Sequence, residues 1–313
     1  MSVRSVPLSA MFGWVVDGFR MFGRSFSSQV GASALMLLLV VAMCLPMWVV
    51  MFMTMGNAVA GGMPVGQSPL VGHMGLFVGM YAVTLVLSIA LFPPMVAGWF
   101  RMDRGIDRGD VVGATSILAP YRDSALWLRS IGFALLAFVI YLAIFGLLAL
   151  AFYGSINEFM QLMQTQQAAA LAGVPPPPPH FPAGLVIGYF LMIVIGSFLQ
   201  LVYLVGFADL ALQGTGAVEA MTRAARATFK NIVMLAIFTI CLFVAAFFAF
   251  MLLGIVIALL MVVLSMLIKW LALVVIMVIY IAFLLCIYPL MFAINYQAWK
   301  SMLGDDATVP LSA

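Results

Sequence analysis

Charged residues are scarce in this chain: Asp, Glu, Lys and Arg make up only 7% of its 313 residues, against about 25% in ordinary soluble domains. Hydrophobic residues make up 66%, and the mean hydropathy is +1.23. A soluble domain does not have enough interior to bury so much apolar surface. The composition therefore predicts a single integral membrane domain over residues 1–313.

Cysteine is also scarce, and recognisable catalytic motifs are missing. Cys44, Cys241 and Cys286 lie in apolar runs, without metal or redox spacing, which indicates packing residues. The sequence has no Walker A, HExxH, GxSxG or paired CxxC motif. Its net charge of +3 is spread over several segments, which does not favour nucleic-acid binding. We therefore expect no catalytic residue, metal, cofactor or nucleic-acid partner.

Ionisable residues are almost missing from the long apolar runs. Asp209 and His73 lie near the ends of two runs, where their side chains can reach the membrane interface. A short segment at 101–110 interleaves three arginines with three aspartates. Such carboxylates can bind a divalent metal, but the arginines compete for them, so we expect solvated ion pairs there.

Six long apolar runs are present, and they are apolar on every face. Each exceeds the roughly 20 residues that a helix needs to cross the hydrocarbon. Strands of a membrane barrel would be short and alternating, so the sequence predicts an all-α bundle of six transmembrane helices. The expected spans are 29–55, 70–100, 130–153, 183–208, 232–260 and 270–296. The last two divide one apolar stretch, with the turn expected around residues 265–269.

The basic residues predict the orientation of these spans. With the N-terminus in the cytoplasm, six spans place all but one of the 13 basic residues on the cytoplasmic side. The exception is Lys269. Basic residues collect on the cytoplasmic side of membrane proteins, so we expect both termini there.

Basic amphipathic segments precede spans 1, 3 and 5 and predict interfacial helices. Before the first span, apolar residues recur at helical spacing opposite Arg20 and Arg24; before the fifth, a stripe joins Glu219, Arg223, Arg226 and Lys230. A weaker copy ends at Arg129 before the third span. The pattern suggests a threefold repeat of helical hairpins, at about 9–100, 105–209 and 214–300.

Prolines mark two further features. Pro93, Pro94 and Pro289 lie near the ends of spans 2 and 6, where we expect helix kinks or breaks. The non-cytoplasmic loop 154–182 begins with a helix-compatible stretch and ends in a proline tract, which we interpret as a stiff spacer.

Four segments carry a family resemblance: GWVVDGFRMFGRSF, FPPMVAGWFRMDRG, EAMTRAARATFKN and PLMFAINYQAWKSM. They resemble a family of uncharacterised multi-span bacterial inner-membrane proteins. More distantly, the chain is similar to the membrane domain of some bacterial glycerophosphodiester phosphodiesterases, although it has a long proline-containing loop and no soluble phosphodiesterase domain. The resemblance implies a six-helix bacterial inner-membrane protein and assigns no catalytic residue.

The leading hypothesis is a non-enzymatic membrane protein that acts at the cytoplasmic leaflet through lipids, anionic ones included, through a partner membrane protein or as a homo-oligomer. Six basic residues at the junctions are candidate contacts to lipid headgroups: Arg20, Arg24, Arg129, Arg223, Arg226 and Lys230. The alternative is a transporter or flippase of a small or lipid-like solute, which the proline-containing spans and the repeat favour.

The orientation can be tested at Lys269, which we expect on the non-cytoplasmic side because it is isolated from the other basic residues. A Lys269→Cys variant, in a background without the three native cysteines, should react with a membrane-impermeant thiol reagent only from that side. Labelling restricted to the cytoplasmic side would contradict the six-span topology.

Overall fold

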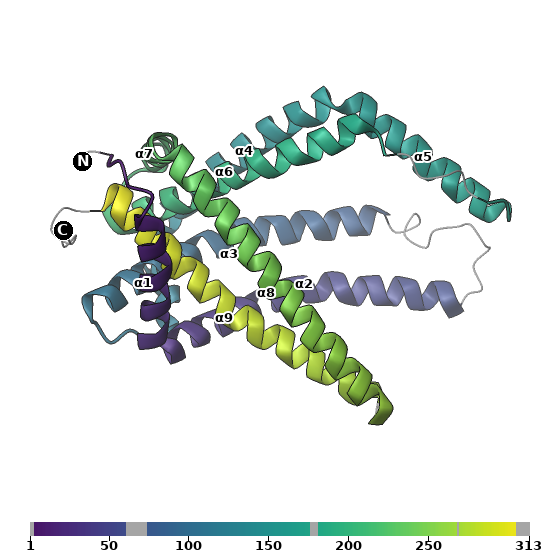
Figure 1. Cartoon of the computed structure of the whole chain (residues 1–313), viewed down its shortest axis with the longest axis horizontal. Helices are drawn as coiled ribbons and strands as arrows, with labels where there is room; N and C mark the ends of the chain where they lie inside the picture. Colours follow the sequence, from purple (N-terminus) through teal and green to yellow (C-terminus); the bar gives the residue numbers. More distant parts are fainter. Residues whose placement is uncertain (1–2, 61–73, 176–180, 268, 305–313) are drawn as a thin grey trace. The chain divides into compact units, whose positions relative to one another are not determined.

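Every regular element that the structure describes is a helix (Figure 1). The computed structural model describes residues 3–60, 74–175, 181–267 and 269–304. The elements in chain order are α1 (Ala10–Arg24), α2 (Phe26–Ala60), α3 (Met74–Arg108), the 3-10 helix η2 (Ala114–Arg122), α4 (Ser124–Ala151), α5 (Tyr153–Leu171), α6 (Ala183–Gln213), α7 (Ala217–Lys230), α8 (Ile232–Leu267) and α9 (Lys269–Leu303).

Six of these helices are long and apolar enough to cross a membrane, which confirms the predicted number. Their apolar segments are Phe26–Thr54, Gly75–Arg108, Ser124–Ala151, Ala183–Gln213, Ile232–Met261 and Val274–Leu303. The long apolar stretch near the C-terminus forms two helices, as predicted: α8 ends at Leu267 and α9 begins at Lys269. The chain is therefore a multi-pass membrane protein.

The chain divides into two compact units. Unit 1 consists of Met1–Val40, Leu91–Phe133 and Leu201–Ala313, and unit 2 of Val41–Ala90 and Ala134–Gln200. The units do not follow the three predicted hairpins, because α2, α3, α4 and α6 each contribute to both.

The core of unit 1 lies where the short elements meet the ends of the long helices. Large side chains with 0% exposure there come from α3, α4 and α6: Trp99, Phe100, Phe133 and Phe207. Farther along α8, by contrast, every residue from 241 to 250 is exposed. This apolar surface is available to lipid chains, which solvate it as well as a protein interior does.

Three short elements of unit 1 each pack on a long helix at a glycine. Gly18 on α1 lies against Ile294 on α9, and Gly98 on α3 lies against the Ile117 backbone of η2. Gly206 on α6 has no room for a Cβ, which would overlap the Phe133 ring and lie 3.3 Å from the Cβ of Ala224 on α7. Thus η2 and α7 each pack on the long helix that precedes them, and α1 packs on the last long helix of the chain.

The junctions α1–α2 and α7–α8 have the same local geometry. Ser25 (φ −128°, ψ 32°) and Asn231 (φ −112°, ψ 20°) interrupt the helix for a single residue. Each side chain donates to the carbonyl four residues earlier, at 2.9 Å, from Ser25 to Met21 and from Asn231 to Ala227. The resemblance predicted between these two junctions therefore extends to their hydrogen bonds.

The third predicted junction has a different local structure. η2 is a 3-10 helix, and the Arg129-Ser130-Ile131 segment lies inside α4. The cause is local: the Asp123 side chain accepts a hydrogen bond from the Leu126 N–H and so begins α4 at Ser124, before Arg129.

The expected proline positions lie inside continuous helices. Pro93 and Pro94 are buried within α3, and Pro289 is buried within α9. The Tyr121 hydroxyl of η2 donates to the Leu91 carbonyl just before the first two. Burial raises the pKa of Tyr121 to about 12, which keeps this donor protonated. Pro46, inside α2, is a further helical proline.

In unit 2, α6 packs closely on the end of α4 and the start of α5. Gly188 faces the ring of Phe152, and Gly196 faces Phe145. Helix α5 confirms the helical start of the loop 154–182, whereas the proline tract lies mostly outside the described residues.

The close approach at Gly98 can be tested by adding one methyl group. A Cβ there would overlap the Ile117 carbonyl, and backbone cannot move aside as a flexible side chain can. Gly98→Ala should therefore lower the thermal stability of the purified protein. Gly13→Ala, in open space on α1, is the matched control, for which helix propensity predicts a gain of about 0.5–1 kcal/mol. Equal stability of the two variants would contradict the packing.

Candidate functional site

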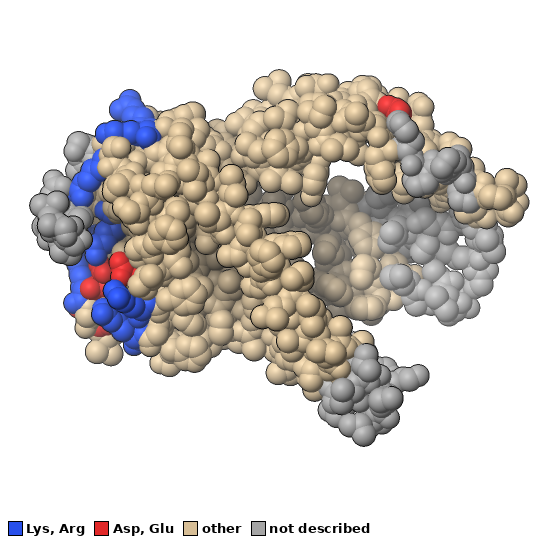
Figure 2. Space-filling model, in the orientation of Figure 1, with Lys and Arg blue, Asp and Glu red and all other residues tan. Residues whose placement is uncertain are grey.

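The charged residues of unit 1 gather at the end where its short elements lie (Figure 2). We call this surface the basic end of unit 1. It is the candidate functional site, because the rest of the described sequence carries few polar groups able to bind or react.

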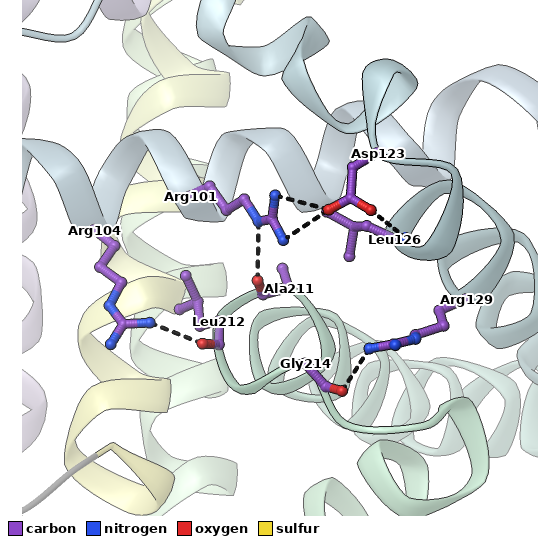
Figure 3. Close-up of polar contacts among 8 residues, drawn as sticks. All are labelled: Arg101, Arg104, Asp123, Leu126, Arg129, Ala211, Leu212 and Gly214. Atoms are coloured by element: carbon purple, nitrogen blue, oxygen red, sulfur yellow. Dashed lines mark hydrogen bonds and ion pairs between the residues drawn. The ribbon is translucent and has the colours of Figure 1, made fainter.

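Three arginines converge on the C-terminal end of α6 (Figure 3). Arg101 donates to the Ala211 carbonyl at 3.2 Å, Arg104 to Leu212 at 2.8 Å and Arg129 to Gly214 at 2.7 Å. The last carbonyls of a helix have no partner within the helix and carry its negative dipole end. The three guanidinium groups supply both the missing donors and the positive charge.

Helix α3 extends farther than the predicted span, and this extension places two of these arginines. It continues to Arg108 and ends at Gly109, whose φ of +85° favours glycine. The expectation of solvated ion pairs among the arginines and aspartates of 101–110 was wrong, because the segment is helical and its charged groups reach other elements. Arg101 and Arg104 bind α6, and Asp107 binds Lys300 on α9.

Asp123 connects this arginine cluster to the start of α4. Its carboxylate accepts from Leu126 N–H at 3.1 Å and lies 3.4 Å from Arg101. The hydrogen bond from the Leu126 N–H has the largest effect on the pKa of Asp123 and lowers it. The positive charge of Arg101 lowers this pKa further. One acidic side chain therefore caps the first turn of α4 and orients an arginine that caps α6.

Asp209 on α6 is a fully buried carboxylate with three partner residues. Arg223 of α7 lies 3.4 Å away with a side chain only 17% exposed, while Asp209 is 0% exposed. The indole N–H of Trp299 and the hydroxyl of Thr215 also donate to it, each at 3.4 Å. Asp209 is thus enclosed by the protein and ties α6 to α7 and α9.

The end of α9 binds α3 through a second acidic residue. The Lys300 ammonium donates to Asp107 at 2.6 Å, and the Tyr296 hydroxyl donates to the same oxygen at 3.1 Å. The ring of Phe292 stacks on Trp99 at 4.6 Å between centroids. The arginines of α3 bind the end of α6, and Trp299 of α9 donates to Asp209 of α6. Each of these three helix ends is therefore bonded to the other two.

The N-terminal segment closes over the end of α9. Arg4 donates to the Gly304 carbonyl at 2.6 Å, and its backbone N–H donates to Met302 at 3.1 Å. The Asn231 side chain binds the same segment twice, accepting from Val6 N–H at 2.8 Å and donating to the Arg4 carbonyl at 3.0 Å. The first residues thus join the end of α9 to the α7–α8 junction.

The six predicted lipid contacts have different environments. Arg129 binds Gly214, Arg223 pairs with Asp209, and Lys230 donates to the Val3 carbonyl at 2.6 Å. Arg20 forms only an exposed pair with Asp17, and Arg24 and Arg226 are exposed. The structure therefore brings some of the set into the protein's own contacts and leaves others on the surface.

Sequence reasoning missed Arg4, Asp123 and the Asp107–Lys300 pair. Asp123 had a usable signal, since Asp directly before an apolar run is a helix N-cap pattern. The other contacts join residues 193 and 300 positions apart, and nothing local indicates them.

The site offers charge and hydrogen bonding rather than an evident reaction centre. In the described part of the chain, no group of three His, Cys, Asp or Glu side chains is placed to hold a metal ion. Its arginines and carboxylates are suited to joining helices and to contacting charged ligands at the surface.

No family model, curated protein or solved structure matches the chain. The resemblance to a bacterial inner-membrane family therefore stays a prediction.

The buried Asp209–Arg223 pair can be tested against an exposed pair in the same protein. Arg223→Gln removes the counter-ion of a buried carboxylate and should lower the free energy of unfolding by about 3 kcal/mol. Arg20→Gln is the matched control, because its exposed pair with Asp17 should contribute less than about 1 kcal/mol. Denaturant unfolding in detergent micelles measures both, and equal losses would contradict the assigned role.

Proposed function

We propose that the chain is a non-enzymatic protein of a bacterial inner membrane, with cytoplasmic termini, and that its basic end binds anionic lipid headgroups at the cytoplasmic leaflet. A partner membrane protein or a second copy of the chain is the other ligand class that such a surface accepts.

The observation that carries this proposal is the combination of exposed aromatic and basic side chains on α1. The opposite side of the helix is buried in unit 1 through Met11, Trp14, Gly18 and Met21. Phe12 and Phe19 are exposed by 66% and 55%, beside the exposed Arg20 and Arg24. A helix with one side fixed to the protein, and with aromatic and basic residues on the other, suits the boundary between headgroups and acyl chains.

Helix α7 supports the same function more weakly. Its buried side consists of small residues, and Arg226 and Phe229 are exposed. Each basic residue near an anionic leaflet contributes about 1 kcal/mol to attraction. Several such residues on α1 and α7 would therefore enrich anionic lipids around unit 1.

Transport of a lipid-like solute is the second candidate, and one feature of unit 2 favours it. An apolar cavity of about 360 Å³ lies between α2 and α3 and is lined by residues that include Pro46, Gly79 and Thr84. Its size and lining suit an acyl chain. Protein-dependent movement of a labelled lipid across reconstituted vesicles would favour this function.

The lipid proposal is tested by native mass spectrometry after gentle extraction. Arg20→Gln with Arg24→Gln should lower the amount of retained anionic phospholipid several-fold, because α1 loses its two exposed arginines. Arg108→Gln with Arg122→Gln is the control, since both arginines are exposed but lie on other elements. It should retain lipid at the wild-type level.

Equal lipid loss from both double variants would show general attraction to net charge and contradict a role specific to α1. Retention unchanged in both would also contradict the proposal. Loss of a copurifying protein with lipid unchanged would instead favour the partner-protein ligand.

A further inference from the structure

Asp103 lies in the contact between α3 and α9. Residues four apart on a helix project from the same side, so Trp99, Asp103 and Asp107 form one row along α3. Trp99 stacks on Phe292 of α9, and Asp107 accepts hydrogen bonds from Tyr296 and Lys300 of α9. Because the residues one turn before and one turn after it both contact α9, Asp103 faces α9 as well.

The surroundings of Asp103 differ sharply from those of the other buried carboxylate. Asp103 and Asp209 are both 0% exposed. Asp209 has an arginine, an indole N–H and a hydroxyl around it. Neither carboxyl oxygen of Asp103 has a hydrogen-bond partner among the described residues.

A buried carboxylate without a partner is far more costly than a neutral carboxylic acid in the same place. The charged and titratable groups near Asp103 do not remove this cost. Asp107 on its own helix adds a like charge, and Arg104 donates to the Leu212 carbonyl. On α9, Tyr296 and Lys300 both donate to Asp107.

We propose that Asp103 is a proton-binding site at which the carboxylic acid, in its neutral form, is enclosed between α3 and α9. Release of the proton to water breaks the O–H bond and leaves two carboxylates one helical turn apart. The new charge lies beside Asp107, which holds Lys300. Proton release therefore acts directly on the contact that holds the end of α9 against α3.

Infrared spectroscopy of the protein in a detergent without carbonyl groups tests this assignment, because a neutral carboxylic acid has a carbonyl band separate from that of a carboxylate. At neutral pH the wild type should show such a band, and Asp103→Asn should lose it. Asp209→Asn is the matched control, since Asp209 is equally buried but has Arg223 beside it, and its band should match the wild type.

A band that persists unchanged in Asp103→Asn, or that is absent from the wild type at neutral pH, overturns the proposal. If the band is absent from the wild type, that spectrum alone contradicts the proposal, even if the Asp103→Asn variant cannot be produced.

Thermal stability as a function of pH gives an independent readout. If the folded protein holds a proton that the unfolded chain releases, stability falls as pH rises. Asp103→Asn resembles the neutral acid and lacks this loss, so its melting temperature relative to wild type should rise by several degrees between about pH 5 and about pH 9. A difference that stays constant over this range would contradict proton binding at Asp103.

Discussion

The ends of the long helices impose the constraint on which the rest of unit 1 depends. A helix that ends at a membrane interface has several carbonyls without partners, and each is costly unless a donor reaches it. The three ends satisfy this need differently. Helix α3 closes on itself at Gly109, α6 receives arginines from α3 and α4, and α9 receives Arg4 from the N-terminal segment. Because two of the three ends take their donors from other elements, the same hydrogen bonds cap a helix and join it to its neighbours.

The same constraint explains why the buried part of unit 1 is so localised. Hydrophobic side chains gain nothing by leaving lipid for a protein interior, so the apolar middle of α8 has no need of a core. At the interface, charged groups and aromatic rings meet water on one side and protein on the other. Close packing at Gly18, Gly98 and Gly206 brings the backbones near enough for side chains such as Arg223 to reach their partners.

The number of spans could be predicted because it depends on length and hydropathy, which are local properties. The division of the last apolar stretch into two helices could be predicted for the same reason. The match between the junctions at Ser25 and Asn231 was visible as a short repeated pattern. The start of α4 was missed, because the cap at Asp123 outweighed the basic pattern around Arg129. The pairing of Lys300 with Asp107 joins residues 193 positions apart and depends on how α3 and α9 meet, which no local pattern encodes.

The contacts of the N-terminal segment set an order on the assembly of the protein during its synthesis. Arg4 binds the carbonyl of Gly304, so this bond can form only after Gly304 has left the ribosome. Until then α1 lacks its packing partner Ile294, and Val6 lacks the Asn231 side chain for most of that time. A segment that is made early is consequently fixed late, and its closure reports that α9 is in place.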